Sequence, residues 1–138
     1  MPPTENPFEL VDDVAWIRAE YDATERIAYF DGRPPEGRTV HGHSLARWQD
    51  GVLIVETSNF TENPIGITAG LPSSTEKHLV ERFTLDDDGQ SLTYSFELTD
   101  PIYLAGPLVG QMRWLYRPNV DFALVPCDPN ATRSFLDN

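Results

Sequence analysis

An Asp-Gly pair between two strand-like runs constrains the fold of this chain more than any other feature of its sequence. Residues 41–49 and 52–60 flank Asp50-Gly51, and Asp-Gly is a preferred sequence for the two-residue type I′ turn of a β-hairpin. Because side chains alternate between the two faces of a strand, such a turn determines both the pairing and the faces of the hairpin. The predicted cross-strand partners are Gln49 and Val52, Arg47 and Ile54, Leu45 and Glu56, His43 and Ser58, and His41 and Phe60.

One face of the predicted hairpin carries both of its histidines together with Arg47 and Glu56. Glu56 lies diagonally across from His43 and Arg47, at a separation that long side chains can bridge. If this face lines a cavity, Glu56 orients His43 as a general acid or base, and Arg47 binds an anion or polarises a carbonyl group. If the opposite face packs on the core instead, the charged face is a solvated salt-bridge cluster, which is the more common place for charged side chains. That opposite face carries Trp48, Leu53 and Val55.

The His41-x-His43 pair places two imidazoles on one side of a strand, as in the metal sites of cupins. The glutamate that a cupin supplies a few residues later is missing, because positions 44–48 read Ser-Leu-Ala-Arg-Trp. A site that has lost a carboxylate ligand and gained a cation is poorly suited to a metal ion. The sequence also contains no glycine-rich phosphate loop and no zinc-type Cys/His spacing. We therefore predict neither a metal nor a cofactor.

Glu81 is the least expected carboxylate in the chain. Alternation across residues 78–85 puts it on one face with three apolar residues: Leu79, Phe83 and Leu85. Unless an arginine reaches it, burial disfavours the ionised form of such a carboxyl group, which is how a general acid or a poised base arises. The alternative is a structural glutamate paired with a buried arginine. The catalytic candidates of the acid/base hypothesis are therefore His43, Arg47, Glu56 and Glu81.

Aromatic side chains indicate a further set of ligand-binding candidates. Residues 108–116 place Trp114 and Tyr116 on one face, and residues 92–99 add Tyr94. Aromatic walls are typical of small-molecule sites, although core packing is the more common role of each residue taken singly. The candidate ligand-binding residues are His41, Phe60, Tyr94, Trp114 and Tyr116.

Short strand-like runs separated by turn residues predict an all-β, mainly antiparallel protein. At 138 residues the chain is expected to be one domain, with residues 1–8 as an N-terminal arm and 127–138 as an irregular tail. Residues 61–77 are longer than a hairpin loop needs and predict an irregular lid or binding loop. The eight expected strands cover about residues 14–21, 26–31, 39–48, 52–60, 78–85, 92–99, 108–116 and 121–125.

Closing eight strands on themselves removes unpaired sheet edges and leaves room for one ligand. A lipocalin-like small β-barrel is therefore the expected architecture. An open sandwich, or a cone-shaped sheet around a helix, is the alternative. Residues 11–25 are the candidate for one short helix.

The charge of the chain narrows the classes of partner. Ten Lys and Arg residues against 22 Asp and Glu residues give a net charge of -12. Such a surface repels phosphate backbones and anionic lipid, so we predict no nucleic-acid partner and no membrane partner. A single cysteine, Cys127, excludes an internal disulfide, and the N-terminal residues lack a basic and apolar leader. Both features predict a cytoplasmic protein.

Several motifs, in order along the chain, carry a resemblance to a known family. They are Asp31-Gly32-Arg33-Pro34, Gly42-His43-Ser44 with Arg47-Trp48, Leu53-Ile54-Val55-Glu56-Thr57 with Phe60, Glu81-Arg82-Phe83, Asp100-Pro101 and the tail with Cys127. With these motifs the sequence resembles a widespread, mostly uncharacterised bacterial family of small lipocalin-like β-barrel domains. The resemblance implies a compact β-barrel and singles out Glu56, Glu81 and Arg82 as matched motif positions. Members of that family are usually longer and often look exported.

These observations predict a β-barrel that binds a small apolar or semi-polar organic molecule. The predicted activity is cofactor-independent acid/base chemistry of the isomerase, cyclase, lyase or hydratase type on a largely apolar organic substrate. In it His43 is the base, Glu56 orients His43, Arg47 binds an anion or carbonyl group, and Glu81 is a buried acid. The alternative is a non-catalytic small-ligand binding protein, which needs no titratable pair in its pocket. A third class is an interaction module that uses an exposed sheet edge or the acidic surface to bind a protein, and a homodimer is compatible with each.

Overall fold

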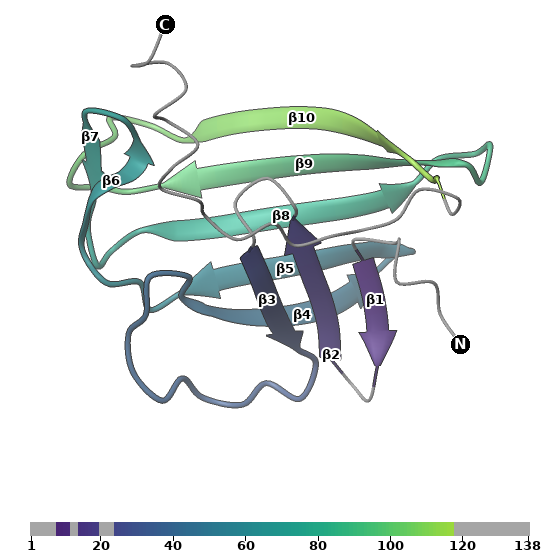
Figure 1. The fold of residues 1–138 in the computed structure, drawn as a ribbon, viewed down its shortest axis with the longest axis horizontal. Coiled ribbons are helices and arrows are strands. Elements are labelled where there is room, and N and C mark those ends of the chain that lie inside the picture. Colours follow the sequence, from purple (N-terminus) through teal and green to yellow (C-terminus); the bar gives the residue numbers. More distant parts are fainter. Residues whose placement is uncertain (1–7, 12–13, 20–23, 118–138) are drawn as a thin grey trace, which may run out of the picture.

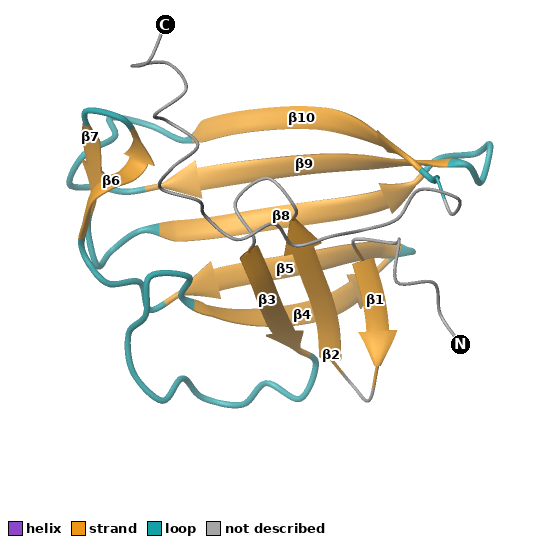
Figure 2. Ribbon diagram, in the orientation of Figure 1, coloured by secondary structure: helices purple, strands orange, loops and turns teal. Residues whose placement is uncertain are grey.

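The computed structural model describes residues 8–11, 14–19 and 24–117. Throughout these residues the chain is all-β, and no helix occurs among them (Figure 2). The described residues likewise include no apolar helix of membrane-spanning length. The strands are β1 (Phe8–Val11), β2 (Val14–Ala19), β3 (Thr24–Tyr29), β4 (His43–Gln49), β5 (Val52–Ser58), β6 (Asn63–Thr68), β7 (Leu71–Ser73), β8 (His78–Leu85), β9 (Ser91–Thr99) and β10 (Leu108–Leu115).

Eight of the strands form one curled sheet in the order β1-β2-β3-β4-β5-β8-β9-β10. All neighbours in this sheet are antiparallel except β3 and β4, which are parallel. The sheet curls so that β1, β2 and β3 cross one face of the longer strands, which makes a half-barrel (Figure 1). The strands β6 and β7 form a separate two-stranded sheet. The predicted all-β, mainly antiparallel class is confirmed, and the curled sheet is consistent with a small β-barrel.

The hairpin of β4 and β5 has both the turn and the register that the sequence predicts. Asp50 and Gly51 have positive φ values of 52° and 78°, as a type I′ turn requires. The predicted pairs from Gln49 with Val52 to His43 with Ser58, and the faces that follow from them, are therefore confirmed. The predicted pair of His41 with Phe60 is wrong, because β4 begins at His43 and β5 ends at Ser58, and Phe60 forms a parallel bridge with Thr39 instead.

The core lies on the face of this hairpin that carries Leu53 and Val55, which we call the core face; the opposite side is the outer face. Leu53 and Val55 are 1% and 0% exposed and pack under the crossing strands, and burial of such apolar side chains is the main stabilising contribution to the fold. Trp48 shares the core face but is half exposed beside the turn. The buried core consists of Ala15, Ile17, Ala28, Ala46, Leu53, Val55 and Phe83.

Two segments differ from the sequence-based expectation. The described residues between 11 and 25 belong to β1, β2 and β3, so the alternative of a short helix there is wrong for them. Over residues 61–77 the sequence predicts one irregular stretch, whereas the structure forms β6 and β7. Gly66 explains this pairing, because a Cβ at that position would collide with the side chain of Ser73 on the facing strand. The predicted strand at 121–125, the tail with Cys127 and residues 1–7 of the arm lie outside the described residues.

Asp100 ties the end of β9 to the segment that follows β7. Its carboxylate accepts hydrogen bonds from the Ser74 N–H at 2.6 Å, the Ser74 hydroxyl at 2.7 Å and the Ile102 N–H at 3.1 Å. The residue is only 1% exposed. Burial alone raises the pKa of Asp100, but the hydrogen bonds from Ser74 and Ile102 outweigh it and lower the pKa. The ionised carboxylate is therefore a structural tie.

Replacing Asp100 with Asn should destabilise the fold by about 1–3 kcal/mol at neutral pH, because an amide cannot accept all of these hydrogen bonds. The pKa is lower in the folded than in the unfolded chain, so the carboxylate contributes stability above the unfolded value of about 4. That contribution is lost as the pH falls through the folded value. Urea unfolding at neutral pH and at about pH 3 measures both, and the gap between wild type and variant should narrow in acid. An unchanged gap would show that the charge of Asp100 does not hold Ser74.

Candidate functional site

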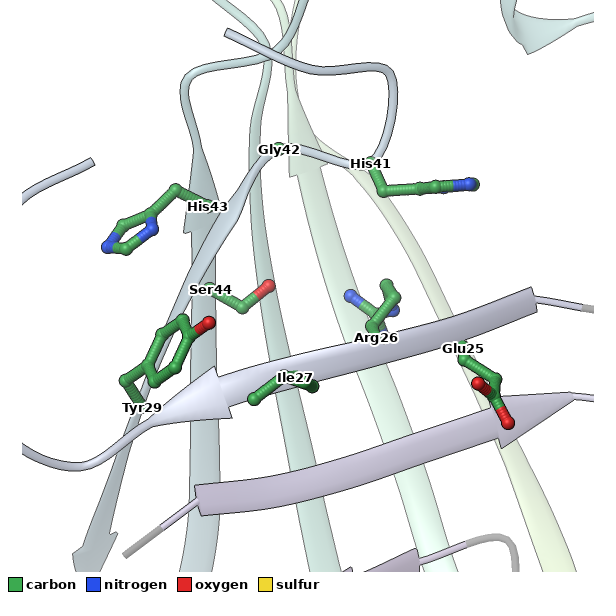
Figure 3. Close-up of a pocket in the computed structure, with 8 residues that line it drawn as sticks. All are labelled: Glu25, Arg26, Ile27, Tyr29, His41, Gly42, His43 and Ser44. Atoms are coloured by element: carbon green, nitrogen blue, oxygen red, sulfur yellow. The ribbon is translucent and has the colours of Figure 1, made fainter. Parts of the chain in front are cut away.

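A pocket opens where β3 and β4 separate (Figure 3). The two strands pair only at Ala28 with Ser44 and at Tyr29 with Leu45, so the first half of β3 diverges from the residues that precede β4. The space between them is about 280 Å³. Its walls are formed by Glu25, Arg26, Ile27, Tyr29, His41, Gly42, His43 and Ser44.

A wider groove of about 500 Å³ adjoins this pocket beneath the loop between β3 and β4. It is lined by residues 33–39 together with Tyr29, Gly42 and His43, and these three also line the pocket. They therefore stand at the boundary between the two spaces, where one ligand would contact both. We refer to the pocket and the groove together as the β3–β4 site.

His43 is held at this boundary by two contacts. Its Nε2 lies 2.8 Å from the carbonyl oxygen of Arg33, and its ring stacks on that of Tyr29 with centroids 5.7 Å apart. The guanidinium of Arg33 also lies over the Tyr29 ring, 4.0 Å from its centroid. Asp31 holds Arg33 through an ion pair, and the hydrogen bonds from Arg33 lower the pKa of Asp31. The outer wall of the site is thus one connected cluster.

Gly42 sets the path of the chain immediately before β4. Its φ is +73°, and a Cβ there would lie 2.6 Å from the carbonyl oxygen of Ser58 and 2.9 Å from the ring of Phe60. The Gly42 N–H donates to the carbonyl oxygen of Thr39 at 3.2 Å, and the Thr39 hydroxyl donates back to the Gly42 carbonyl at 3.2 Å. Glycine alone combines this backbone conformation with so close an approach. The positions of both adjacent histidines therefore depend on it.

On the core face, Glu81 is paired with an arginine. Arg26 Nη2 donates to the two carboxylate oxygens at 2.9 and 2.8 Å, and the Tyr94 hydroxyl donates to Oε2 at 2.6 Å. The side chains of Glu81 and Arg26 are 3% and 15% exposed. Burial and the negative charge of Glu81 raise the pKa of Tyr94, so its hydroxyl remains a donor at neutral pH. Of the two roles weighed for Glu81, the geometry matches the glutamate paired with a buried arginine.

The sequence analysis missed Arg26, together with Glu25, Ile27 and Tyr29, as residues of this site. Arg26 lines the pocket while its Nη2 holds Glu81, and its Nε and Nη1 form no hydrogen bond with any other described residue. Alternation along β3 was the available signal, because it places Arg26 on one face with Ala28 and Phe30. Ala28 belongs to the buried core, and Phe30 packs against it.

The structure does not bring the four catalytic candidates together. Arg47 and Glu56 form an ion pair of 3.1 Å on the outer face, with side chains 49% and 40% exposed. Such an exposed pair contributes only about 0–1 kcal/mol. His43 also belongs to the outer face, whereas Glu81 lies on the core face. The reason is alternation, because the register of β5 and β8 places Val55, rather than Glu56, opposite Glu81.

Of the predicted ligand-binding residues, only His41 is among the walls of the β3–β4 site. Tyr94 and Trp114 stack on each other with centroids 4.8 Å apart and pack against the core. Phe60 is buried beside Gly42, and Tyr116 is half exposed just after β10. Both rings also contact the buried ring of Phe83, so Tyr94 and Trp114 serve core packing.

No family model, no curated protein and no solved structure matches this chain. By its own fold and site, the described part of the chain is a small all-β half-barrel with an open pocket beside a parallel strand pair. The resemblance to small bacterial β-barrel domains stays a prediction. Within the described part of the chain, no three His, Cys, Asp or Glu side chains are grouped so that they could hold a metal ion.

Proposed function

We propose that this chain is a small-molecule-binding protein whose ligand occupies the β3–β4 site. One observation carries the proposal: two sets of polar groups meet at one opening. Arg26 and Ser44 reach it from the core face, and Tyr29 and His43 reach it from the outer face. A concave wall with a few convergent polar groups is typical of small-molecule sites.

Arg26 is the proposed anchor for the ligand. Nη2 of Arg26 donates its hydrogen bonds to Glu81. Because the guanidinium is planar, this contact fixes the direction of the remaining N–H groups of Arg26, at Nε and Nη1. These groups would donate to a carbonyl or carboxylate oxygen. Because Glu81 already balances the charge of Arg26, a neutral carbonyl compound suits the site, and a protein of net charge -12 does not repel it.

The proposed ligand is more polar than the largely apolar molecule that the sequence suggests. Ile27 is the only aliphatic residue among the eight that line the pocket. The ring of Tyr29 is already covered by the guanidinium of Arg33 and stacked on the ring of His43, so polar groups rather than a free aromatic face select the ligand. The ligand class is therefore a small organic molecule that carries a carbonyl oxygen.

We propose binding in preference to isomerase, cyclase, lyase or hydratase chemistry. Acid/base catalysis needs two titratable groups at one ligand atom. Of the predicted acid/base set only His43 lines the pocket, because Glu81 is held by Arg26 and Tyr94 and neither Arg47 nor Glu56 is among the walls. Glu25 and His41 also line the pocket, but among the described residues no hydrogen bond joins either of them to His43. The geometry of the candidate residues thus supports the binding protein that the sequence left as the alternative.

Replacing Ile27 with Trp should weaken ligand binding by at least about tenfold, because the larger ring fills the pocket. Ile27 is 37% exposed, so the fold should tolerate the change. The matched control is Ile65→Trp on β6, which is 66% exposed and is not among the site residues. Protein-observed NMR with a library of carbonyl-bearing aromatic fragments provides the measurement. Fragments that leave residues 41–44 unshifted, or that bind Ile27→Trp as well as wild type, would refute the proposed site.

A further inference from the structure

We propose that His43 is the specificity residue of the β3–β4 site and selects ligands that carry an N–H or O–H donor, which it accepts at Nδ1. This inference rests on the proposed binding function and names the chemistry of its ligand. It follows from the partner of the other ring nitrogen, from the fixed position of the ring and from the place of His43 between pocket and groove.

The partner of Nε2 determines the tautomer of His43. The atom 2.8 Å from Nε2 is the backbone carbonyl oxygen of Arg33, and a carbonyl oxygen can only accept a hydrogen bond. Nε2 must therefore carry the proton and donate it. In a neutral imidazole this leaves the lone pair on Nδ1, which makes Nδ1 an acceptor.

The position of the ring is fixed as well as its tautomer. Tyr29 stacks on it at 24° between the ring planes, and the chain enters His43 from Gly42, whose backbone packs against Ser58. No other described residue forms a hydrogen bond with Nδ1. An acceptor that is held in place and has no partner in the described chain is suited to recognise a donor on a ligand.

The arrangement also predicts which molecules are rejected. A ligand without a donor at this position would cover Nδ1 and leave it unpaired, which costs more than the hydrogen bond itself gains. The favoured class is therefore a carbonyl compound with a hydroxyl or amide N–H group. Its carbonyl oxygen is positioned by Arg26 and its donor by His43, which line opposite sides of the same pocket (Figure 3).

The first experiment measures the tautomer without any ligand. Two-bond ¹H–¹⁵N correlation spectra at about pH 8, where histidine side chains are ordinarily neutral, should show a protonated Nε2 and an unprotonated Nδ1 for His43. The opposite tautomer would overturn the inference and leave the proposed binding function standing.

The second experiment compares 4-hydroxyacetophenone with 4-methoxyacetophenone, which keeps the carbonyl group and removes the only hydrogen-bond donor of the compound. Wild type should bind the hydroxyl compound about tenfold more tightly, which is the difference in affinity expected from one well-placed hydrogen bond. In His43→Gln the side-chain amide can still donate to the carbonyl of Arg33 but offers nothing at the position of Nδ1, so the preference should vanish. His78→Gln, the same change on β8, should retain it, and melting temperatures confirm that each variant is folded.

The binding function of the β3–β4 site and the selective role of His43 can fail separately in this experiment. Equal binding of the two compounds to wild type, or a preference that survives in His43→Gln, would overturn the role of His43 while residues 41–44 still report binding. If neither compound shifts the resonances of the β3–β4 site, both the binding function and this inference fail for carbonyl aromatics.

Discussion

Arg26→Met should destabilise the folded protein by about 3–5 kcal/mol, the largest effect that we expect from one substitution. The change leaves the carboxylate of Glu81, which is 3% exposed, without a counter-charge. The hydroxyl of Tyr94 remains as a donor, but one neutral hydrogen bond does not replace a two-oxygen contact with a guanidinium. Urea unfolding followed by tryptophan fluorescence measures the loss.

Two further variants show whether the uncompensated charge is the cause. The double variant Arg26→Met with Glu81→Gln should recover most of the lost stability, because removing both charges of a buried pair is far less harmful than removing one. The outer-face control is Arg47→Met, which breaks the exposed pair with Glu56 and should change stability by about 0–1 kcal/mol. If Arg26→Met were as mild as Arg47→Met, the core-face pair would not be the buried tie that the geometry indicates.

Gly42→Ala should destabilise the fold by about 2–4 kcal/mol and abolish ligand binding at the β3–β4 site. The added Cβ would meet the Ser58 carbonyl oxygen at 2.6 Å and a methyl group of Thr57 at 2.8 Å, in a backbone conformation that alanine rarely adopts. The segment must therefore move away from β5, and His43 moves with it. Chemical denaturation gives the first quantity, and NMR titration of the same fragments gives the second.

Gly51→Ala is the matched control for this substitution. Gly51 has a similar φ of +78°, but a Cβ there meets nothing within 4 Å. This variant should show only the backbone strain, about 1 kcal/mol, with ligand binding unchanged. Equal losses for the two variants would mean that close contact with β5 is not what positions residues 41–43.

The β4–β5 hairpin was predictable from sequence because its determinants are local. A two-residue turn requires positive φ at Asp50 and Gly51, and the strand period of two then assigns every side chain to a face. The same alternation identified Glu81 as a carboxylate among apolar neighbours. Alternation along β3 marks Arg26 in the same way, as a charged residue among apolar neighbours of its own face.

Pairing between distant segments was not predictable in this way. Arg26 and Glu81 are 55 residues apart, and they meet because the curl of the sheet carries β3 across its core face, with one end near β8 (Figure 1). The sequence offered two faces of the hairpin for the core and could not choose between them, because both carry apolar residues. The choice depends on where β2 and β3 lie, since their alanines and Ile17 pack against Leu53 and Val55.

Local alternation and one turn thus determined the all-β class, the register of the central hairpin and the set of side chains on each of its faces. The tertiary structure alone decided that the charged face is the outer one, that Glu81 is an ion-pair partner of Arg26, and that the opening lies between β3 and β4. The physical reason is that face and register follow from neighbouring residues along the chain. Burial and the shape of a pocket depend instead on which distant strands come to lie against each other, here through a parallel pairing of only Ala28 with Ser44 and Tyr29 with Leu45.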